Sequence, residues 1–517
     1  MSTAVVRSDV STIRRVALIA AIALALGGAV AANATIKRHQ LANSQAAQSA
    51  VAFVHPTGRA HSTAWYCPGP LALGLAHEHS HLVIANVAAH AVSGQLLVAT
   101  TTGQTYTYSV TVRRDSTTDV ALPSPKKSTF AAASLLADGT GIGVEEITDG
   151  TTGRLAAPCV VNPSLNDYIP AGSTRGASDV AISLYDPGAT PSVANVRFVT
   201  ANGSEYPLAL QGLPINAGEV VVVDIGKDVA QSGVVATDVA ASGGSLVVGA
   251  IERAQVGPVT VPSLVSGDGS GASSWYLPAL PAGGSTLNYV YVEDVGASPT
   301  TASISFTSAD NDSEVAAVRV GAGGIARLTQ GPGGSLGELR FAKVESKVPV
   351  VVEESSQLSS PLDVPGPVVR QVRQSGKASG TAANALSASI EGLPSKIPTG
   401  FAVTNATVTS AEWLLPGGES NAKAGEFVTF ANPTSVPAVI SLSTIAHRAV
   451  TVIAKASSIL VPAGGTAAVD LSRVLPSENG VSVLVTSTTR IVVAGSLYAK
   501  GSKGSVGFSD PVAIPVD

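Results

Sequence analysis

The sequence predicts an all-β protein, with tandem β-sandwich (Ig-like) modules behind one amino-terminal transmembrane helix. Three observations predict this fold class: a recurring sequence phrase, alternating strands separated by turns, and a composition that disfavours helices. Charged residues make up only 13% of the 517 residues, whereas Gly and Pro number 52 and 31. Such a mixture favours short strands and frequent turns over long amphipathic helices.

The recurring phrase is an aromatic residue followed closely by a proline. A weaker copy, Tyr168-Ile169-Pro170, lacks the tryptophan. The full copies begin at Trp65, Trp275 and Trp413. We expect these aromatic side chains to fill a module core or a seam between modules, because large rings contribute most when they are buried.

An apolar run that ends in a polar turn follows each phrase by some twenty residues. These runs cover residues 82–86, 180–187, 289–294 and 427–433. Further alternating strands and Gly-rich turns follow, at intervals of about ten residues. Each repeat is about the size of one β-sandwich. The alternative is a β-propeller-like assembly in which each repeat supplies two blades.

These repeats predict the organisation of the chain. The expected parts are a cytoplasmic tail (1–15), a transmembrane anchor or signal segment (16–36), a stalk (37–62), β-module one (63–162), β-module two (163–265), β-module three (270–362), a linker or insertion (363–408) and β-module four (409–517).

The amino terminus predicts the compartment. Residues 16–36 carry no charge, and Arg14 and Arg15 precede them. As a helix this stretch would cover about 30 Å, enough to span a bilayer with its basic flank in the cytoplasm. We therefore predict a single-pass membrane protein whose carboxyl-terminal part is extracytoplasmic. The alternative is secretion after signal cleavage, because Ala29-Val30-Ala31 resembles a small-residue cleavage site.

The two cysteines fit an exported protein. Cys67 and Cys159 are the only cysteines of the sequence, and outside the cytoplasm such a pair tends to form a disulfide. Their spacing is not the Cys-x-x-Cys pattern of redox motifs, so we predict a structural disulfide.

The order of the aromatic phrase, a strand ending in Asn-Pro, Gly-rich hairpins and a Val-rich closing strand is similar to a family of unknown function in actinobacterial exported proteins. The clearest stretch runs from Trp413 to Asn432-Pro433. The resemblance implies one amino-terminal membrane segment and a repeated β ectodomain, with Cys67 and Cys159 as a module-closing pair. It implies no catalytic residues.

The sharpest chemical motif is His77-Glu78-His79-Ser80-His81, which formally matches the His-Glu-x-x-His signature of zinc proteases. That mechanism needs His77 and His81 one turn apart on a helix, together with a third ligand. The repeat instead places the stretch immediately before a strand, where His77, His79 and His81 would share one face. We interpret it as a solvated loop and retain the three histidines as weak metal candidates.

No cofactor is predicted, and a net charge of −5 without a basic stripe argues against nucleic acid. We expect a non-enzymatic cell-envelope protein whose modules act as a structural spacer or interaction surface. Its expected partners are the membrane, through residues 16–36, and envelope proteins or cell-wall polymers. A carbohydrate-binding protein that uses a tryptophan such as Trp275 as a stacking platform is the alternative, followed by an exported metal-dependent hydrolase.

Overall fold

The computed structural model divides the chain into two units, residues 1–51 and 52–517. The residues that it describes all belong to the second unit: 62–69, 79–123, 130–150, 153–256, 259–282, 286–308, 313–330, 338–358, 362–364, 395–397, 400–404, 406–420, 424–476, 478–499, 508–509 and 512–516. No helix within these ranges is long and apolar enough to cross a membrane. The predicted membrane segment 16–36 lies outside them, as does most of the predicted stalk.

The first half of the described chain forms two β-sandwiches. Sandwich one contains β1 (Thr63–Cys67), β2 (His79–Asn86), β3 (Val92–Thr100), β4 (Thr105–Val112), β5 (Ser116–Ala121), β6 (Ala131–Ala137), β7 (Ile142–Gly150) and β8 (Gly153–Pro158). Sandwich two contains β9 (Asn166–Ile169), β10 (Asp179–Tyr185), β11 (Ser192–Thr200), β12 (Gly203–Glu205), β13 (Leu213–Ile215), β14 (Val220–Asp224), β15 (Val235–Ser242), β16 (Val247–Val256) and β17 (Val259–Ser266), with the 3₁₀ turns η1 (Leu208–Leu210) and η2 (Ile225–Lys227).

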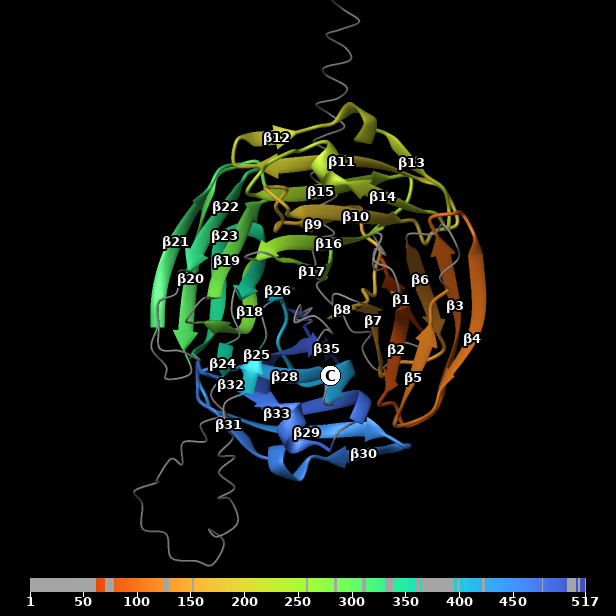
Figure 1. Cartoon of the computed structure of the whole chain (residues 1–517), viewed down its shortest axis with the longest axis vertical. Helices are drawn as coiled ribbons and strands as arrows, with labels where there is room; N and C mark the ends of the chain where they lie inside the picture. Colours follow the sequence, from red (N-terminus) through yellow and green to blue (C-terminus); the bar gives the residue numbers. More distant parts are fainter. Residues whose placement is uncertain are drawn as a thin grey trace, which may run out of the picture. The chain divides into compact units, whose positions relative to one another are not determined.

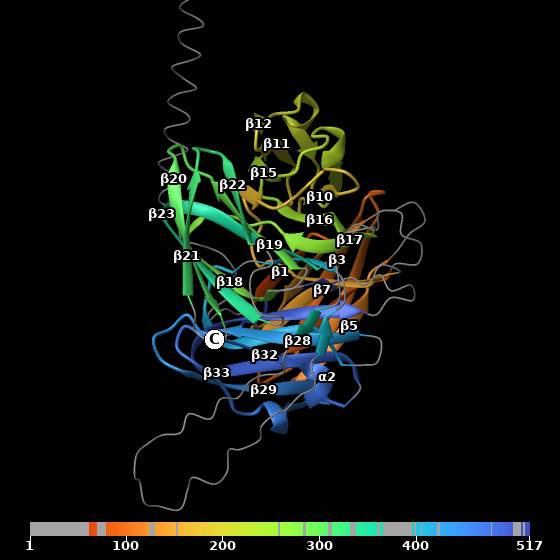
Figure 2. The same ribbon diagram turned by 60° about the vertical axis from the view of Figure 1, so that its left-hand side comes forward.

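The second half forms two more sandwiches (Figures 1 and 2). Sandwich three contains β18 (Ala272–Ala282), β19 (Thr286–Asp294), β20 (Thr300–Ser308), β21 (Ser313–Val320), β22 (Ile325–Gln330), β23 (Glu338–Leu358) and β26 (Gly400–Thr404), with the hairpin β24 (Leu362–Val364) and β25 (Ser395–Ile397). Sandwich four contains β27 (Ser410–Ser420), β28 (Ala424–Ala431), β29 (Ala438–Ala446), β30 (Ala449–Val452), β31 (Ile459–Val461), β32 (Thr466–Asp470), β33 (Glu478–Ala499), β34 (Phe508–Ser509) and β35 (Ile514–Pro515), with η3 (Ala454–Ala456) and the helix α2 (Leu471–Val474).

All four sandwiches share one strand topology. Numbered within each sandwich, one sheet has the order one-six-three-four and the other has the order five-two-seven-eight; sandwich one is the plainest case, with β1-β6-β3-β4 and β5-β2-β7-β8. In sandwiches three and four a single long strand, β23 or β33, supplies both strand six and strand seven. The tandem β-modules are therefore present. Their order differs from the ABED/CFG order of immunoglobulin constant domains, because strands one and two lie in different sheets.

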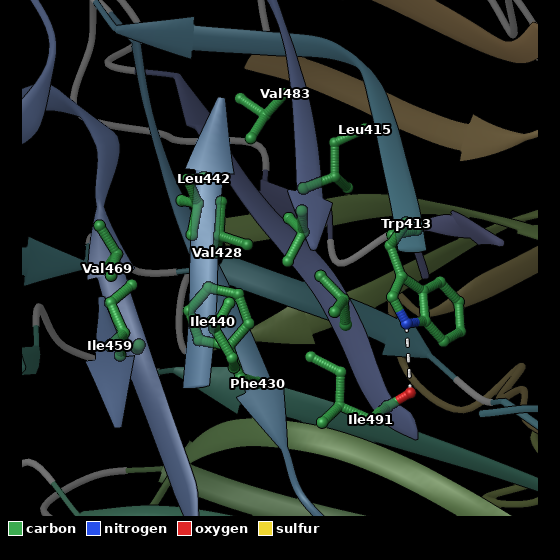
Figure 3. Close-up of a cluster of buried hydrophobic side chains, with 14 of the residues drawn as sticks. Trp413, Leu415, Val428, Phe430, Ile440, Leu442, Ile459, Val469, Val483 and Ile491 are labelled. Atoms are coloured by element: carbon green, nitrogen blue, oxygen red, sulfur yellow. Dashed lines mark hydrogen bonds between the residues drawn. The ribbon is translucent and has the colours of Figure 1, made fainter. Parts of the chain in front are cut away.

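The tryptophans of the recurring phrase lie inside the cores, on strand one of their sandwiches. Trp65, Trp275 and Trp413 are at most 1% exposed. The Trp275 indole N–H donates to the Val350 carbonyl at 2.7 Å, and that of Trp413 donates to the Ile491 carbonyl at 3.2 Å. Figure 3 shows Trp413 beside the Val, Ile, Leu and Phe side chains of sandwich four. The Trp275 and Trp413 indoles therefore contribute apolar area and also satisfy a carbonyl within the long strands β23 and β33.

The polar residue that ends strand two has the same role in every sandwich. Its side-chain oxygen accepts a hydrogen bond from the backbone N–H two residues later, at 2.7–3.1 Å. The residues are Asn86, Asp186, Asp294 and Asn432, all fully buried. This Asx turn fixes where the strand ends and gives the buried side-chain oxygen a backbone donor.

The eighth strands bring the four sandwiches into cyclic contact. β8 contacts β17, β17 contacts β26, β26 contacts β34, and β34 contacts β8. The last contact returns to the first sandwich, as Figure 1 shows where the blue strands lie beside the orange ones. It is reinforced by the Thr117 and Ser482 hydroxyls, which are 2.6 Å apart. The set of sandwiches closes on itself as a propeller does, but each member is a two-sheet sandwich and not a pair of blades.

The segment predicted as a linker, residues 363–408, contains a structural strand. Residues 400–404 form β26, which pairs with β23 and takes part in the cycle of eighth strands. Ala406 follows and accepts the Tyr276 amide N–H at 2.7 Å, which joins sandwiches three and four. Residues 365–394 lie outside the described part of the chain.

Candidate functional site

Buried carboxyl groups gather where one sandwich meets the next. They are carried mainly by strand seven and by the strands beside it. All are less than 9% exposed: Glu145, Glu146, Asp238, Glu252, Glu293, Glu353, Glu354 and Glu426. A buried carboxylate is costly unless it is paired, hydrogen-bonded or protonated, so the partners of these groups determine what the contacts can do.

The turn after the recurring phrase supplies backbone donors to three of these groups. The residue that follows the proline donates its N–H to a glutamate oxygen. The pairs are Gly69 to Glu146 at 2.9 Å, Ala171 to Glu353 at 2.8 Å and Gly417 to Glu145 at 2.8 Å. The phrase therefore has two functions: its aromatic residue fills a core, and its turn binds a carboxyl group. Two of the three hydrogen bonds join different sandwiches.

Burial controls the protonation of these glutamates. It raises the pKa of Glu146 and of Glu353 to about 8 and that of Glu145 to about 7, and the backbone N–H donors oppose this rise only in part. The ordinary pKa of a glutamate is 4.5. Glu146 and Glu353 consequently hold their protons at neutral pH in the folded protein, whereas Glu145 loses its proton around pH 7.

Two contacts between sandwiches have the same construction. Between sandwiches two and three, the Ala171 N–H of sandwich two donates to Glu353 of sandwich three, and the nearby Glu252 of sandwich two disfavours ionisation of Glu353 because like charges repel. Between sandwiches four and one, the Gly417 N–H of sandwich four donates to Glu145 of sandwich one, and the nearby Glu426 of sandwich four disfavours ionisation of Glu145. The same construction therefore joins sandwich two to sandwich three and sandwich four to sandwich one.

Glycine is required at the second of these contacts. A Cβ on Gly417 would overlap the Ile147 side chain and lie 2.8 Å from Glu145 Oε2. A Cβ on Gly418 would overlap the Glu426 carboxyl group and lie 2.6 Å from the Val481 carbonyl. The bare backbone therefore lets both carboxyl groups approach the turn closely.

The predicted disulfide is present between Cys67 and Cys159. It ties the end of β1 to the residue that follows β8, and the Glu146 carboxyl group lies beside it. Within the described ranges, Cys67, Glu146 and Cys159 form a group of three metal-type ligands, with ligand atoms within 4.8 Å of one another. Because both sulfurs are bonded to each other, they do not offer the thiolates that a metal would bind.

The histidine motif does not form the helix that a zinc protease needs. Residues 79–86 are the strand β2. His81 is buried there, with its ring nitrogens 3.6 Å from Asp119 and 3.8 Å from Asp149. His77 and the His79 side chain lie outside the described residues. The structure thus gives His81 two carboxylate neighbours and an extended backbone, which excludes the one-turn spacing of the His-Glu-x-x-His mechanism.

The prediction that a tryptophan such as Trp275 offers an exposed platform for carbohydrate stacking is wrong. Trp275 is 0% exposed, as is Trp413, and Trp65 is 1% exposed. A sugar ring cannot stack on an indole without solvent access. Tyr168 is mostly buried near the contact with sandwich three, where burial and the nearby Asp238 and Glu293 carboxyl groups raise its pKa well above the ordinary value.

Sequence reasoning missed the buried carboxyl groups, although one signal was present. Glu145-Glu146 and Glu353-Glu354 stand at matching places in modules one and three, each directly after an apolar run. Two adjacent charges in a strand put a carboxyl group on both of its faces. A half-exposed strand would leave one of them in water, and only a strand covered on both sides buries both.

Comparisons with known proteins find a family match over part of the chain. A family of unknown function, DUF5719, matches residues 360–507. No curated protein has significant similarity to this sequence. A solved structure described as a tetra-tandem repeat in the extending region of a large adhesion protein aligns with 84% of this chain and 95% of its own, at 14% identity. Its TM-score is 0.11, which is too low to relate the two folds.

Proposed function

We propose that this chain is a non-enzymatic cell-envelope protein whose cyclic set of four sandwiches serves outside the cytoplasm as a structural spacer or interaction surface. The observation that carries the proposal is how the buried polar groups are used. Glu145 and Glu353 bind backbone N–H groups of a neighbouring sandwich, and the Thr117 hydroxyl meets Ser482. Polar chemistry that an enzyme would concentrate at one substrate site is here distributed over contacts that join the sandwiches.

Two further features support the proposal. The Cys67–Cys159 disulfide fits an oxidising compartment, and the uncharged segment 16–36 fits a membrane anchor that leaves the sandwiches outside. A match to a family of unknown function is compatible with this reading. Envelope proteins or cell-wall polymers would be the partners.

Site-specific photocrosslinking in intact cells tests the proposal. A photoreactive amino acid at Tyr206, which is 60% exposed on sandwich two, should capture an envelope protein or a wall polymer. The matched position Tyr185 is fully buried and should yield no external adduct. A membrane-impermeant protease should also degrade the protein in intact cells. Resistance to the protease, or stoichiometric zinc in the purified full chain, would count against the proposal.

A further inference from the structure

Two buried carboxyl groups meet where sandwich two contacts sandwich three. Asp238 lies on β15 of sandwich two and Glu293 lies on β19 of sandwich three, and the two groups are placed so that a hydrogen bond can form between them when one carries a proton. Asp238 also accepts from Arg197 of β11, at 2.9 Å from Nε and again from Nη2. The same guanidinium lies 3.9 Å from Glu293 Oε1. The contact therefore contains two acids and one arginine.

The burial of the two acids requires a proton between them. Glu293 is 0% exposed and Asp238 is 8% exposed. Among the described residues, no N–H or hydroxyl group donates to either oxygen of Glu293 or to Oδ1 of Asp238. Ionised carboxylates can only accept, so the two side chains bond to each other only when one of them carries a proton.

The surroundings oppose removal of that proton. The acidic neighbours are Glu353 on β23, which acts on Glu293, and Glu252 on β16, which acts on Glu353. Tyr168 and Asp167 on β9 approach from sandwich two. Three other titratable groups face the two acids or their arginine. Tyr206 accepts a hydrogen bond from Arg197, and Tyr291 on β19 has Arg327 of β22 beside it.

Arg197 is poorly placed to neutralise a second negative charge on Glu293. It is already engaged with Asp238, and its Nη1 would lie 3.1 Å from a Cβ at Gly323 of sandwich three. A charge on Glu293 would add to that of Asp238 in a buried region, where like charges repel strongly, and to that of Glu353 once Glu353 ionises.

We propose that the contact between sandwiches two and three is a proton-dependent latch, closed while Glu293 and Asp238 share one proton and loosened when that proton leaves. Burial, followed by the Asp238 charge, raises the pKa of Glu293 well above its ordinary value. The folded contact therefore retains the proton to a higher pH than an exposed carboxyl group would. As pH rises through the raised pKa, the contact loses its stabilisation.

Hydrogen exchange measured from pH 6 to pH 9 on the full chain in mild detergent tests the latch. After correction for intrinsic rates, the β9 amides (Asn166–Ile169) should lose protection by up to about tenfold for each pH unit between the ordinary pKa of a carboxyl group and the raised pKa of the pair, and the loss should level off above the raised pKa. The β10 amides (Asp179–Tyr185), inside sandwich two and paired on both sides, are the internal reference and should stay protected.

The decisive variant is Glu293→Gln, because its amide N–H₂ can donate permanently to Asp238. At pH 9 it should keep at least about tenfold more β9 protection than the wild type, whereas Glu205→Gln, an exposed control, should behave as the wild type. Equal losses in the Glu293→Gln and wild-type proteins would overturn the latch.

Two further measurements keep the inference testable if Glu293→Gln does not fold. The infrared spectrum of the wild type at pH 7 should contain buried protonated-carboxyl absorption, which should decline in step with β9 protection as pH rises. Absence of that absorption would refute the latch. Restoration of β9 protection at pH 9 by calcium, reversed by a chelator, would also refute it, because the acids would then hold a cation and not a proton.

Discussion

Replacement of Glu353 by glutamine should make the stability of sandwich three less dependent on pH. Burial raises the pKa of Glu353 from the ordinary 4.5 to about 8. At about 1.4 kcal/mol for each pH unit, that rise corresponds to about 5 kcal/mol of differential stability. Glutamine keeps an oxygen to accept the Ala171 N–H, which lies 2.8 Å from Glu353 Oε2 in the wild type, but it cannot ionise.

The direction of the effect follows from where the proton is held. Below pH 4.5 the Glu353 carboxyl group is protonated in both the folded and the unfolded chain, so it adds no pH dependence to the unfolding free energy. Between pH 4.5 and 8 only the folded chain keeps the proton, so wild-type stability falls as pH rises. Glu353→Gln should therefore resemble the wild type near pH 4.5 and exceed it by up to about 5 kcal/mol near pH 9.

Urea unfolding followed by hydrogen exchange of the β19 and β23 amides measures this difference for sandwich three alone, which avoids assuming that all four sandwiches unfold together. The exposed substitution Glu205→Gln is the control. The reasoning is refuted if the difference between Glu353→Gln and the wild type is constant from pH 5 to pH 9, or if the variant is the less stable protein at pH 9.

Three other substitutions probe the remaining features. Gly417→Ala should lower the unfolding free energy by about 1–3 kcal/mol, because its Cβ would overlap the Ile147 side chain, whereas Gly321→Ala, which meets no atom within 4 Å, should have little effect in the same urea titration. Loss of the disulfide through Cys67→Ala should cost about 4–5 kcal/mol, given the 92-residue separation, and should be visible as a lower melting temperature of sandwich one. Asn432→Ala should lower the unfolding free energy by about 1–3 kcal/mol, because the Thr434 N–H and nearby carbonyls lose their hydrogen-bond partner. If calorimetry finds the same stability for the variant and the wild type, the Asx turn does not stabilise the sandwich.

The architecture was largely predictable because the strands carry their own signals. The run 180–187 is apolar and ends in a polar turn; the structure places residues 180–185 in β10 and the Asx turn at Asp186, directly after the strand. The tandem arrangement followed from the repetition of this pattern. The strand order did not follow, because the pattern fixes which faces are apolar and leaves the choice of neighbouring strands open.

The candidate site was not predictable to the same degree. Glu145 and Glu353 meet turns from other sandwiches that are 272 and 182 residues away in the chain. No local pattern encodes such a pairing. The segment 400–404 was hidden for a related reason: β26 lies in a stretch rich in turn residues, and it pairs with β23 more than 40 positions earlier.

Cyclic closure of the four sandwiches is the central structural claim, and a disulfide trap between sandwiches one and four tests it most directly. The Thr117 and Ser482 hydroxyls are 2.6 Å apart although 365 residues separate them. In the full chain, Thr117→Cys combined with Ser482→Cys should form a second disulfide under mild oxidation, detected as a cross-linked peptide by mass spectrometry. Free thiols at both positions after oxidation would show that sandwich four does not return to sandwich one.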